Sequence, residues 1–365
     1  MSASDAARRI ALCATGKSGL GHLRRLTNIA LQLRKQRPTL HLDLYTNAEP
    51  AALSTDELGL FAAVRLCERS EMAARLVAEE HELVLVDTAV LPGLEQVRGR
   101  LCLVLRETIE SRLHEFRLGA GRRWDLVLLP NPPATFDPPA ELLGAQRLES
   151  VGWIYRAPED GDAGAVHSAA GGLRGRLGLA MDMPLLLIAC GGGGNAITAD
   201  RFAALVDPLI QRTRGLMQRR FEAVLACGPR AAPPLAQVDA SLTPGADLNR
   251  WFAEADAVIS TTGYNSALEL ALLDVPAVLV PINRSLDDQR RRAAELAKVV
   301  GAMLEPDSVD SVAAWLAVVL DQGRRRSPLD LGGSGALRAA RSLLALLDSS
   351  SGDVRSHDAG ERRRQ

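Results

Sequence analysis

The sequence has few aromatic residues, almost no net charge and no long apolar segment. Phe, Trp and Tyr make up 4% of its 365 residues, so an aromatic platform for stacking sugars is not evident. The formal net charge of -1 excludes a general positive field that would attract nucleic acid or an anionic membrane, so any anion site must be local. No stretch reaches the roughly 20 apolar residues that span a bilayer, and no secretory signal precedes the first predicted strand. We expect a cytoplasmic protein.

Cysteine patterns typical of metal or redox sites are also missing. The cysteines are odd in number, show no CxxC spacing and mostly lie in apolar stretches: Cys13, Cys67, Cys102, Cys190 and Cys227. We predict buried thiols. One DxD sequence, Asp160-Gly161-Asp162, is formally a metal motif. It lies in a segment rich in proline and glycine rather than at the end of a strand, so we expect no required metal.

Short apolar stretches alternate with amphipathic ones along the chain. The predicted strands are RIALCATG, LHLDLYTN, LVLVDT, LCLVLRET and DLVLLPNP in the first half, and PLLLIACGGGG, FEAVLACGP, DAVISTTG and AVLVPIN in the second. This rhythm is typical of βαβ units, and nearly continuous apolar strands indicate parallel sheets covered by helices on both faces. The sequence therefore predicts an α/β protein with two facing, Rossmann-like, doubly wound domains. Their ligands should lie beyond the carboxyl ends of the strands.

Composition also predicts where the domains begin and end. Residues 130–165 concentrate proline, glycine and acidic residues around VGWIY, which indicates a hinge. We expect one domain over 1–150, a hinge over 151–165 and a second domain over 166–348. Residues 349–365 have almost no apolar side chains and are predicted to be a disordered tail.

The stretch TGKSGLGHLRR at residues 15–25 resembles two phosphate-binding motifs and fits neither. A P-loop would need glycine at position 11, which is Ala11, and the glycines are spaced G-x-x-G-x-G rather than G-x-G-x-x-G. What remains is a glycine loop that leads from a strand into a helix whose apolar residues recur at helical spacing.

Three basic side chains, His22, Arg24 and Arg25, fall in the first turn of this helix. Positive charge opposes the helix dipole there, so a bound phosphate or acidic ligand would offset it; alternatively, the arginines point into solvent. A histidine at a helix N-terminus is expected to stay neutral near pH 7, which suits a general base. The alternative for His22 is a capping or packing role.

Two segments carry a resemblance to a known family. GLGHLRRLTNIALQL resembles the GxGHxxR loop of nucleotide-sugar enzymes with the glycosyltransferase-B fold. The segment from STTGYNSALELALL to the D-x-Q helix is similar to the nucleotide-binding half of the peptidoglycan N-acetylglucosaminyltransferase group, the glycosyltransferase family 28 C-terminal domain. The resemblance implies an acceptor domain at the N-terminus and a nucleotide-sugar domain after the hinge.

The resemblance also implies donor-binding residues. Glu269 stands where relatives bind the ribose hydroxyls, and Gln289, beside Asp288, stands where they contact the donor sugar. The implied phosphate-binding set comprises Gly19 and Gly21, the loop Gly191, Gly192, Gly193, Gly194 and Asn195, and the turn Thr262, Gly263, Asn265 and Ser266. The physical reading agrees, because backbone N–H groups at glycine turns can approach a diphosphate closely. Two alternatives stay open: Ser266 and Glu269 fit a capping box, and the glycine loop fits an ordinary strand-to-helix turn.

The chain departs from the family pattern after the D-x-Q sequence. Relatives have asparagine before the alanine, whereas this chain has Arg292 before Ala293. A different or more acidic donor sugar would fit this change, although a run of arginines is more typical of a solvated helix face. Two interpretations, membrane contact or solvated charge, also apply to Arg324, Arg325 and Arg326.

Two carboxylates are predicted at strand ends in the first domain. Asp87 closes LVLVD and Glu107 closes LCLVLRE, so both should face the same cleft as His22. Either could orient the histidine or accept a proton, and either could instead form a surface ion pair.

These observations together favour an inverting, metal-independent glycosyltransferase with a UDP-sugar donor, similar to UDP-N-acetylglucosamine, and no cofactor. The expected partners are the nucleotide sugar and a hydroxyl or lipid-linked acceptor, with peripheral membrane contact possible and no nucleic acid. Two alternatives are a UDP-sugar hydrolase, similar to the pseudaminic acid pathway enzyme, and a sugar-nucleotide sensor without catalysis.

Overall fold

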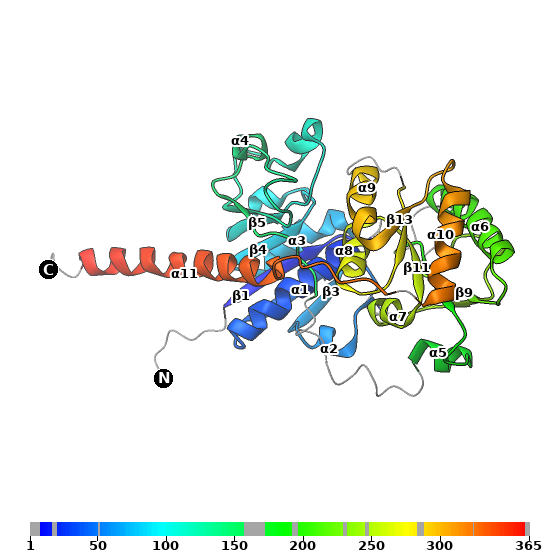
Figure 1. The fold of residues 1–365 in the computed structure, drawn as a ribbon. Helices are drawn as coiled ribbons and strands as arrows, with labels where there is room; N and C mark the ends of the chain where they lie inside the picture. Colours follow the sequence, from blue (N-terminus) through cyan, green and yellow to red (C-terminus); the bar gives the residue numbers. More distant parts are fainter. Residues whose placement is uncertain are drawn as a thin grey trace.

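The computed structural model describes residues 8–16, 20–49, 52–156, 172–191, 196–228, 232–244, 248–282, 288–323 and 325–361. Two fully parallel sheets lie side by side, and helix α8 lies between them (Figure 1). The hinge and the DxD sequence predicted over 151–165 fall mostly outside the described residues.

The first sheet is built from the N-terminal part of the chain. Its strand order is β3-β2-β1-β4-β5-β6-β7. The strands are β1 (Arg9–Ala14), β2 (His41–Thr46), β3 (Ala63–Leu66), β4 (Leu83–Asp87), β5 (Arg100–Val104), β6 (Leu126–Leu129) and β7 (Leu148–Ser150). The helical segments between them are α1 (Gly21–Gln36), α2 (Thr55–Leu58), α3 (Arg69–Glu79), η2 (Leu94–Gln96), η3 (Glu110–Phe116) and α4 (Ala140–Leu143).

The second sheet has the order β10-β9-β8-β11-β12-β13. Its strands are β8 (Leu185–Ala189), β9 (Glu222–Ala226), β10 (Ala240–Leu242), β11 (Ala257–Thr261), β12 (Ala277–Val280) and β13 (Gly301–Met303). The helices of this half are α5 (Gly172–Leu177), α6 (Ala196–Leu216), α7 (Leu248–Glu254), α8 (Tyr264–Leu272), α9 (Gln289–Val300) and α10 (Val309–Gln322). The last helix is α11 (Gly335–Glu361).

Each sheet has a hydrophobic core on both faces, as the continuous apolar strands predict. In β1, Ile10 and Leu12 belong to the core under α1, whereas Ala11 and Cys13 belong to the core on the other face. The α/β fold with doubly wound sheets is therefore confirmed. Four of the five cysteines are buried, as predicted, and Cys227 is partly exposed.

The sequence analysis misses four strands, β3, β7, β10 and β13. All four are edge strands of three or four residues, and their side chains are mostly half-exposed. Because an edge strand need not be apolar throughout, it lacks the continuous apolar run by which the interior strands are recognised.

Helix α11 differs from the prediction in two respects. It returns to the N-terminal half and packs against α1, where Leu343 and Leu347 join the core of the first sheet (Figure 1). The sequence placed residues up to 348 in the second domain. The helix also continues to Glu361, where the sequence predicted disorder from residue 349. Its packed first half supplies the nucleus from which the polar second half extends, since helix propagation is easier than nucleation.

Replacement of Leu343 tests whether α11 is part of the N-terminal core. Leu343 is fully buried, so Leu343→Ala should lower the free energy of unfolding by about 2–5 kcal/mol through lost burial and the remaining cavity. Urea denaturation measures this change. Val77→Ala, on the exposed side of α3, is the control and should cost less than about 0.5 kcal/mol. A neutral Leu343→Ala would contradict the packing of α11.

Candidate active site

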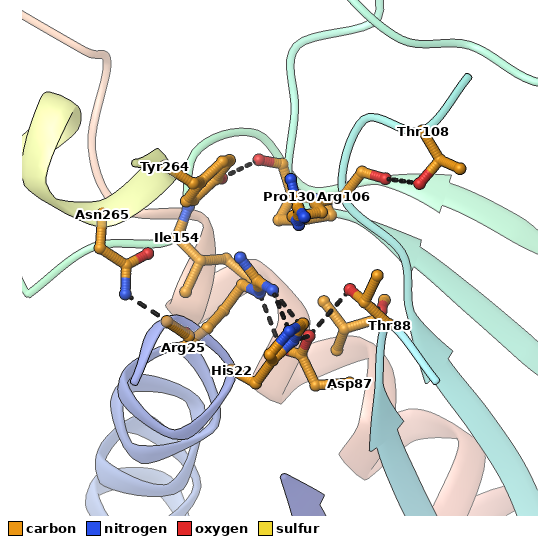
Figure 2. A network of polar contacts seen from close by, with 12 residues as sticks. His22, Arg25, Asp87, Thr88, Arg106, Thr108, Pro130, Ile154, Tyr264 and Asn265 are labelled. Carbon is orange, nitrogen blue, oxygen red and sulfur yellow. Dashed lines mark hydrogen bonds and ion pairs between the residues drawn. The ribbon is translucent and has the colours of Figure 1, made fainter. Parts of the chain in front are cut away.

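The candidate site lies where the carboxyl ends of the first sheet meet the N-terminus of α8. His22 is the second residue of α1, which follows β1, and Asp87 is the last residue of β4. Tyr264 and Asn265 open α8, which follows β11 of the second sheet. Figure 2 shows these side chains together. As predicted for parallel sheets, the strand ends gather the polar groups.

His22 and Asp87 form a hydrogen-bonded pair. Nδ1 of His22 lies 2.7 Å from Oδ1 of Asp87. Asp87 is completely buried, whereas the His22 side chain is 17% exposed. A carboxylate at Nδ1 accepts a hydrogen bond from that nitrogen, so in the neutral imidazole the proton lies on Nδ1 and the lone pair on Nε2. Among the described residues, none hydrogen-bonds to Nε2, so this nitrogen is available to a ligand.

Arg25 holds Asp87 from the other side. Its Nε donates to Oδ2 at 2.7 Å and its Nη2 donates to Oδ1 at 2.6 Å, and both side chains are buried. Burial alone would raise the pKa of Asp87, but the charges of Arg25 and His22 and their hydrogen bonds lower it far below the usual range. The carboxylate is therefore ionised at every physiological pH.

Thr88 is a further hydrogen-bond donor to Asp87, and its backbone is conformationally strained. Its Oγ1 donates to Oδ1 of Asp87 at 2.8 Å, so that oxygen accepts from three donors. The backbone of Thr88 has φ 46, which is unfavourable for a β-branched residue. Such strain is retained when the surrounding contacts over-determine it.

The C-terminal half contacts Arg25 and the first residue of α1, Gly21, directly. The ring of Tyr264 lies over the guanidinium of Arg25, with Cζ 5.0 Å from the ring centroid. The Tyr264 hydroxyl donates to the carbonyl of Pro130, which follows β6. Asn265 Nδ2 donates to the carbonyl of Gly21 at 3.2 Å, beside His22 (Figure 2). The two halves therefore meet within hydrogen-bonding distance at the candidate site.

Glu107 is paired with arginines of the second half in the structure. Its carboxylate pairs with Arg291, and Nη2 of Arg292 lies 3.5 Å from Oε2. Glu107 thus forms an ion pair between the two halves, which was the alternative to its predicted catalytic role. Its backbone N–H donates to the side chain of Asn131 at 3.0 Å.

Arg292 is not part of a solvated helix face, which corrects the interpretation favoured from the sequence. Its side chain is 6% exposed, and Nη1 donates to the carbonyl of Thr262 at 3.0 Å. The guanidinium also lies 5.9 Å from the ring centroid of Tyr264. Arg292 is therefore buried where the two halves meet, although it stands in a run of arginines that is typical of an exposed helix face.

The arginines of α1 have protein partners. Arg24 makes two hydrogen bonds of 2.7 and 2.8 Å to Glu57, which Arg156 contacts at 2.7 Å. Burial alone would raise the pKa of Glu57, but the charges of Arg24 and Arg156 and a backbone hydrogen bond at Ser54 lower it. Glu57 and Asp87 neutralise the positive charges of Arg24 and Arg25. These arginines therefore do not require the bound anion that the sequence argument assumed. The capping alternative for His22 also fails, since Leu20 is the N-cap and has no side-chain cap bond.

The predicted donor-binding turn lies at the start of α8. Gly263 is the N-cap of this helix and Thr262 is fully buried. Because the helix begins at Tyr264, Ser266 and Glu269 do not form the capping box that the sequence allowed. Burial raises the pKa of Glu269, while the charge of Arg24 and a hydrogen bond with Asn249 lower it. Glu269 therefore lies close enough to Arg24 for their charges to interact.

The other predicted donor residues have structural partners or lie outside the described residues. Asp288 is the N-cap of α9 and accepts from the N–H of Arg291. Gln289 is buried and its Oε1 accepts from the N–H of Ile282 at 3.3 Å. Gly191 has φ 71, and a Cβ there would lie 3.2 Å from Oγ1 of Thr261, so the turn after β8 requires glycine. Gly19, Gly192, Gly193, Gly194 and Asn195 lie outside the described residues.

Two further expectations concern membranes and metals. Arg326 is partly exposed and donates to the carbonyls of Leu270 and Val275 near the end of α8, so its guanidinium has protein partners. No helix among the described residues is long and apolar enough to cross a membrane. Asp43, Glu79 and His81 have the spacing of metal ligands, but Arg9 already pairs with both carboxylates of this group.

Sequence reasoning missed Tyr264 and Arg156. Tyr264 stands in STTGYNS directly after a predicted strand and is one of only three tyrosines, which is a usable signal. The sequence contains no comparable signal for the contact of Arg156 with Glu57, because this contact depends on how the two halves lie relative to each other.

Comparison with solved structures defines the class of fold. The chain is similar to the glycotransferase of kitacinnamycin, with TM-score 0.55 and 15% identity over 93% of this chain and 99% of that one. It is also similar to a Listeria monocytogenes protein assigned as a UDP-N-acetylglucosamine 2-epimerase, with TM-score 0.56 and 12% identity over 95% and 97%. These likenesses show a glycosyltransferase-B fold.

Sequence comparison places the C-terminal half more narrowly. Residues 200–327 match the glycosyltransferase family 28 C-terminal domain. The predicted resemblance is thereby confirmed there, while that of the GxGHxxR loop stays a prediction.

Curated relatives are UDP-N-acetylglucosamine--N-acetylmuramyl-(pentapeptide) pyrophosphoryl-undecaprenol N-acetylglucosamine transferases. The protein from Methylobacterium sp. (strain 4-46) is 31% identical over 149 residues, 39% of this chain and 40% of the relative. The protein from Frankia casuarinae is 29% identical over 185 residues, 48% of each chain. The chain spans less than half the length of these relatives.

Replacement of Asp87 tests the buried ion pair. Asp87→Asn leaves the Arg25 guanidinium without a charged partner and should lower the free energy of unfolding by about 3–5 kcal/mol at pH 7. Because the folded state depresses the pKa of Asp87, its contribution is complete above the unfolded value of about 3.9 and is lost as the pH falls below it. Urea denaturation between about pH 7 and pH 3 should therefore show a gap between wild type and variant that narrows with acid. Exposed Asp137→Asn is the control, and a constant gap would contradict the role of this ion pair.

Proposed function

We propose that the protein is an inverting, metal-independent glycosyltransferase that uses a UDP-sugar donor. The observation that carries this proposal is the His22–Asp87 pair, with Nε2 available, beside the N-terminus of α8. The family 28 domain over residues 200–327 and the names of the curated relatives support UDP-N-acetylglucosamine as the donor type.

His22 would act as the general base. Nε2 removes the proton from an acceptor hydroxyl, whose oxygen attacks the anomeric carbon of the donor. The bond from that carbon to the diphosphate oxygen breaks, UDP leaves with the electron pair, and a single displacement inverts the configuration. Asp87 orients the imidazole and stabilises the imidazolium that forms.

The C-terminal half would hold the donor. The N-terminus of α8 favours negative charge near the departing diphosphate, and a fixed dipole needs no reorganisation during reaction. Glu269 would accept hydrogen bonds from the ribose hydroxyls. The acceptor would be a hydroxyl compound, and the relatives' names favour a lipid-linked one reached at a membrane surface.

Hydrolysis of the UDP-sugar is the second candidate. It is favoured by the hydrogen bond of Asn265 to the carbonyl of Gly21 beside His22, because such a close contact between the halves suits a small nucleophile such as water. The chemistry is the same, with water in place of the acceptor hydroxyl. A sensor without catalysis would retain donor binding and need neither Asp87 nor His22.

Replacement of His22 tests the proposed base. His22→Gln should lower kcat for UDP release about a hundredfold or more, because the step loses its proton acceptor, while the affinity for UDP changes little. The assay offers a panel of UDP-sugars with and without hydroxyl acceptors, with and without chelator, and follows UDP and sugar by mass spectrometry. The exposed His114→Gln is the control.

The outcomes separate the candidates. Transfer that survives chelation and requires His22 supports the transferase, whereas free sugar released without an acceptor identifies a hydrolase. UDP binding with no turnover in any mixture would favour the sensor. Turnover that is equal in wild type and His22→Gln would contradict the proposed base.

Replacement of Glu269 tests donor binding separately. Glu269→Gln should weaken UDP binding about tenfold, since hydrogen bonds to a charged acceptor are lost. Titration calorimetry with UDP measures the affinity, and Glu295→Gln on α9, with a side chain 56% exposed, is the matched control. Unchanged affinity in Glu269→Gln would place the ribose elsewhere.

A further inference from the structure

A basic pocket lies at the edge of the first sheet that is opposite the candidate active site. It has a volume of about 470 Å³ and is lined by Arg98, Gly99, Arg100, Gly121, Arg122, Arg123, Asp125 and Gln146. Arg100 is the first residue of β5, and the other residues lie in the segments that precede β5, β6 or β7. Glu107 and Asn131, by contrast, follow β5 and β6. With five residues in β5, the two edges are about 16 Å apart.

The pocket carries a surplus of positive charge. Four arginines face one acidic residue among the described residues that line it, which leaves a surplus of three charges. Asp125 is itself occupied, because Oδ1 accepts from Arg100 at 2.9 Å and Oδ2 accepts from the N–H of Leu101 at 2.9 Å. Arg98 lies 3.9 Å from Glu80, and both of these side chains are highly exposed, so that pair offsets little.

Backbone contacts hold two of the arginines in place. Arg122 donates to the carbonyl of Gly99 at 2.9 Å, and Arg123 donates to the carbonyl of Ala145. The loop that carries them turns through Ala120 and Gly121, both with positive φ, and Ala120 is strained there. Guanidinium groups fixed in this way lose less entropy when they bind a ligand.

We propose that this arginine pocket, formed by Arg98, Arg100, Arg122 and Arg123, binds a phosphate group with two or more negative charges. Arginine forks match phosphate oxygens, and fixed guanidinium groups bind them through charge-assisted hydrogen bonds. No aromatic side chain is present among the described residues that line the pocket, so a nucleobase has nothing to stack on. The site is separate from the proposed donor site and does not depend on the proposed function.

Pyrophosphate binding to the full chain tests the arginine pocket. Titration calorimetry at constant ionic strength compares wild type with Arg98→Gln/Arg122→Gln and with Arg69→Gln/Arg75→Gln, which removes the same charge from α3. The pocket variant should bind pyrophosphate at least about tenfold more weakly than wild type, and the α3 variant within about twofold. Since pyrophosphate could also occupy the donor site, the titration is repeated with excess UDP.

The single variant Arg98→Gln keeps the proposal testable if the double variant does not fold. Its side chain is 93% exposed, so the fold should tolerate the change, and binding should weaken about threefold. Equal affinities in all variants, or no binding by wild type, would overturn the proposal and mark these arginines as solvated charges.

A second arm distinguishes the source of the phosphate. Vesicles of phosphatidylglycerol and phosphatidylcholine in equal parts are sedimented with each variant. Binding that requires Arg98 and Arg122 and is displaced by pyrophosphate identifies a lipid headgroup as the ligand. Pyrophosphate binding without vesicle binding identifies a soluble phosphate compound. Vesicle binding that is equal in all variants shows that membrane contact occurs elsewhere.

Discussion

The buried ion pair between Arg25 and Asp87 supports the rest of the candidate site. Two charges without solvent are tolerated only when their geometry is good and their remaining hydrogen-bonding groups are satisfied. Here the contact is bidentate, and His22 and Thr88 supply further donors to the carboxylate. The pair fastens the first turn of α1 to the end of β4, and thereby fixes the position of His22. It also presents a guanidinium face to Tyr264 of the other half.

Contacts between the halves make this local arrangement depend on the whole molecule. Tyr264, Asn265 and Arg291 reach across from the second half to groups at the strand ends of the first. Helix α11 adds a covalent connection, because it leaves the second half and packs into the core of the first. A ligand at the start of α8 would therefore lie against the element that touches Arg25. If the donor binds there as proposed, its binding and the position of His22 would be physically linked.

The parts that the sequence predicted share a local cause. Interior strands are covered by helices on both faces, so they are continuous apolar runs, and β1, β4, β5, β8 and β11 are recognised from composition alone. The proximity of His22 and Asp87 follows from the rule that parallel strands end at one edge of a sheet. Edge strands such as β7 and β10 lack this signature. Glu107, like Asp87, lies beyond the carboxyl end of a parallel strand. Its partner, however, is Arg291 from the other half, which no local sequence pattern reveals.

The sequence by itself determined the class of fold, the positions of the interior strands along the chain and the group of polar residues at their carboxyl ends, because periodicity is a local property of a strand. Tertiary structure decided which of these residues pair. In the sequence, Arg24, Arg25 and Arg292 are all basic residues in predicted helices. Their environments differ only because the fold places Glu57 beside Arg24, Asp87 beside Arg25 and Tyr264 beside Arg292. The physical reason is that desolvation and charge pairing depend on neighbours that are distant along the chain.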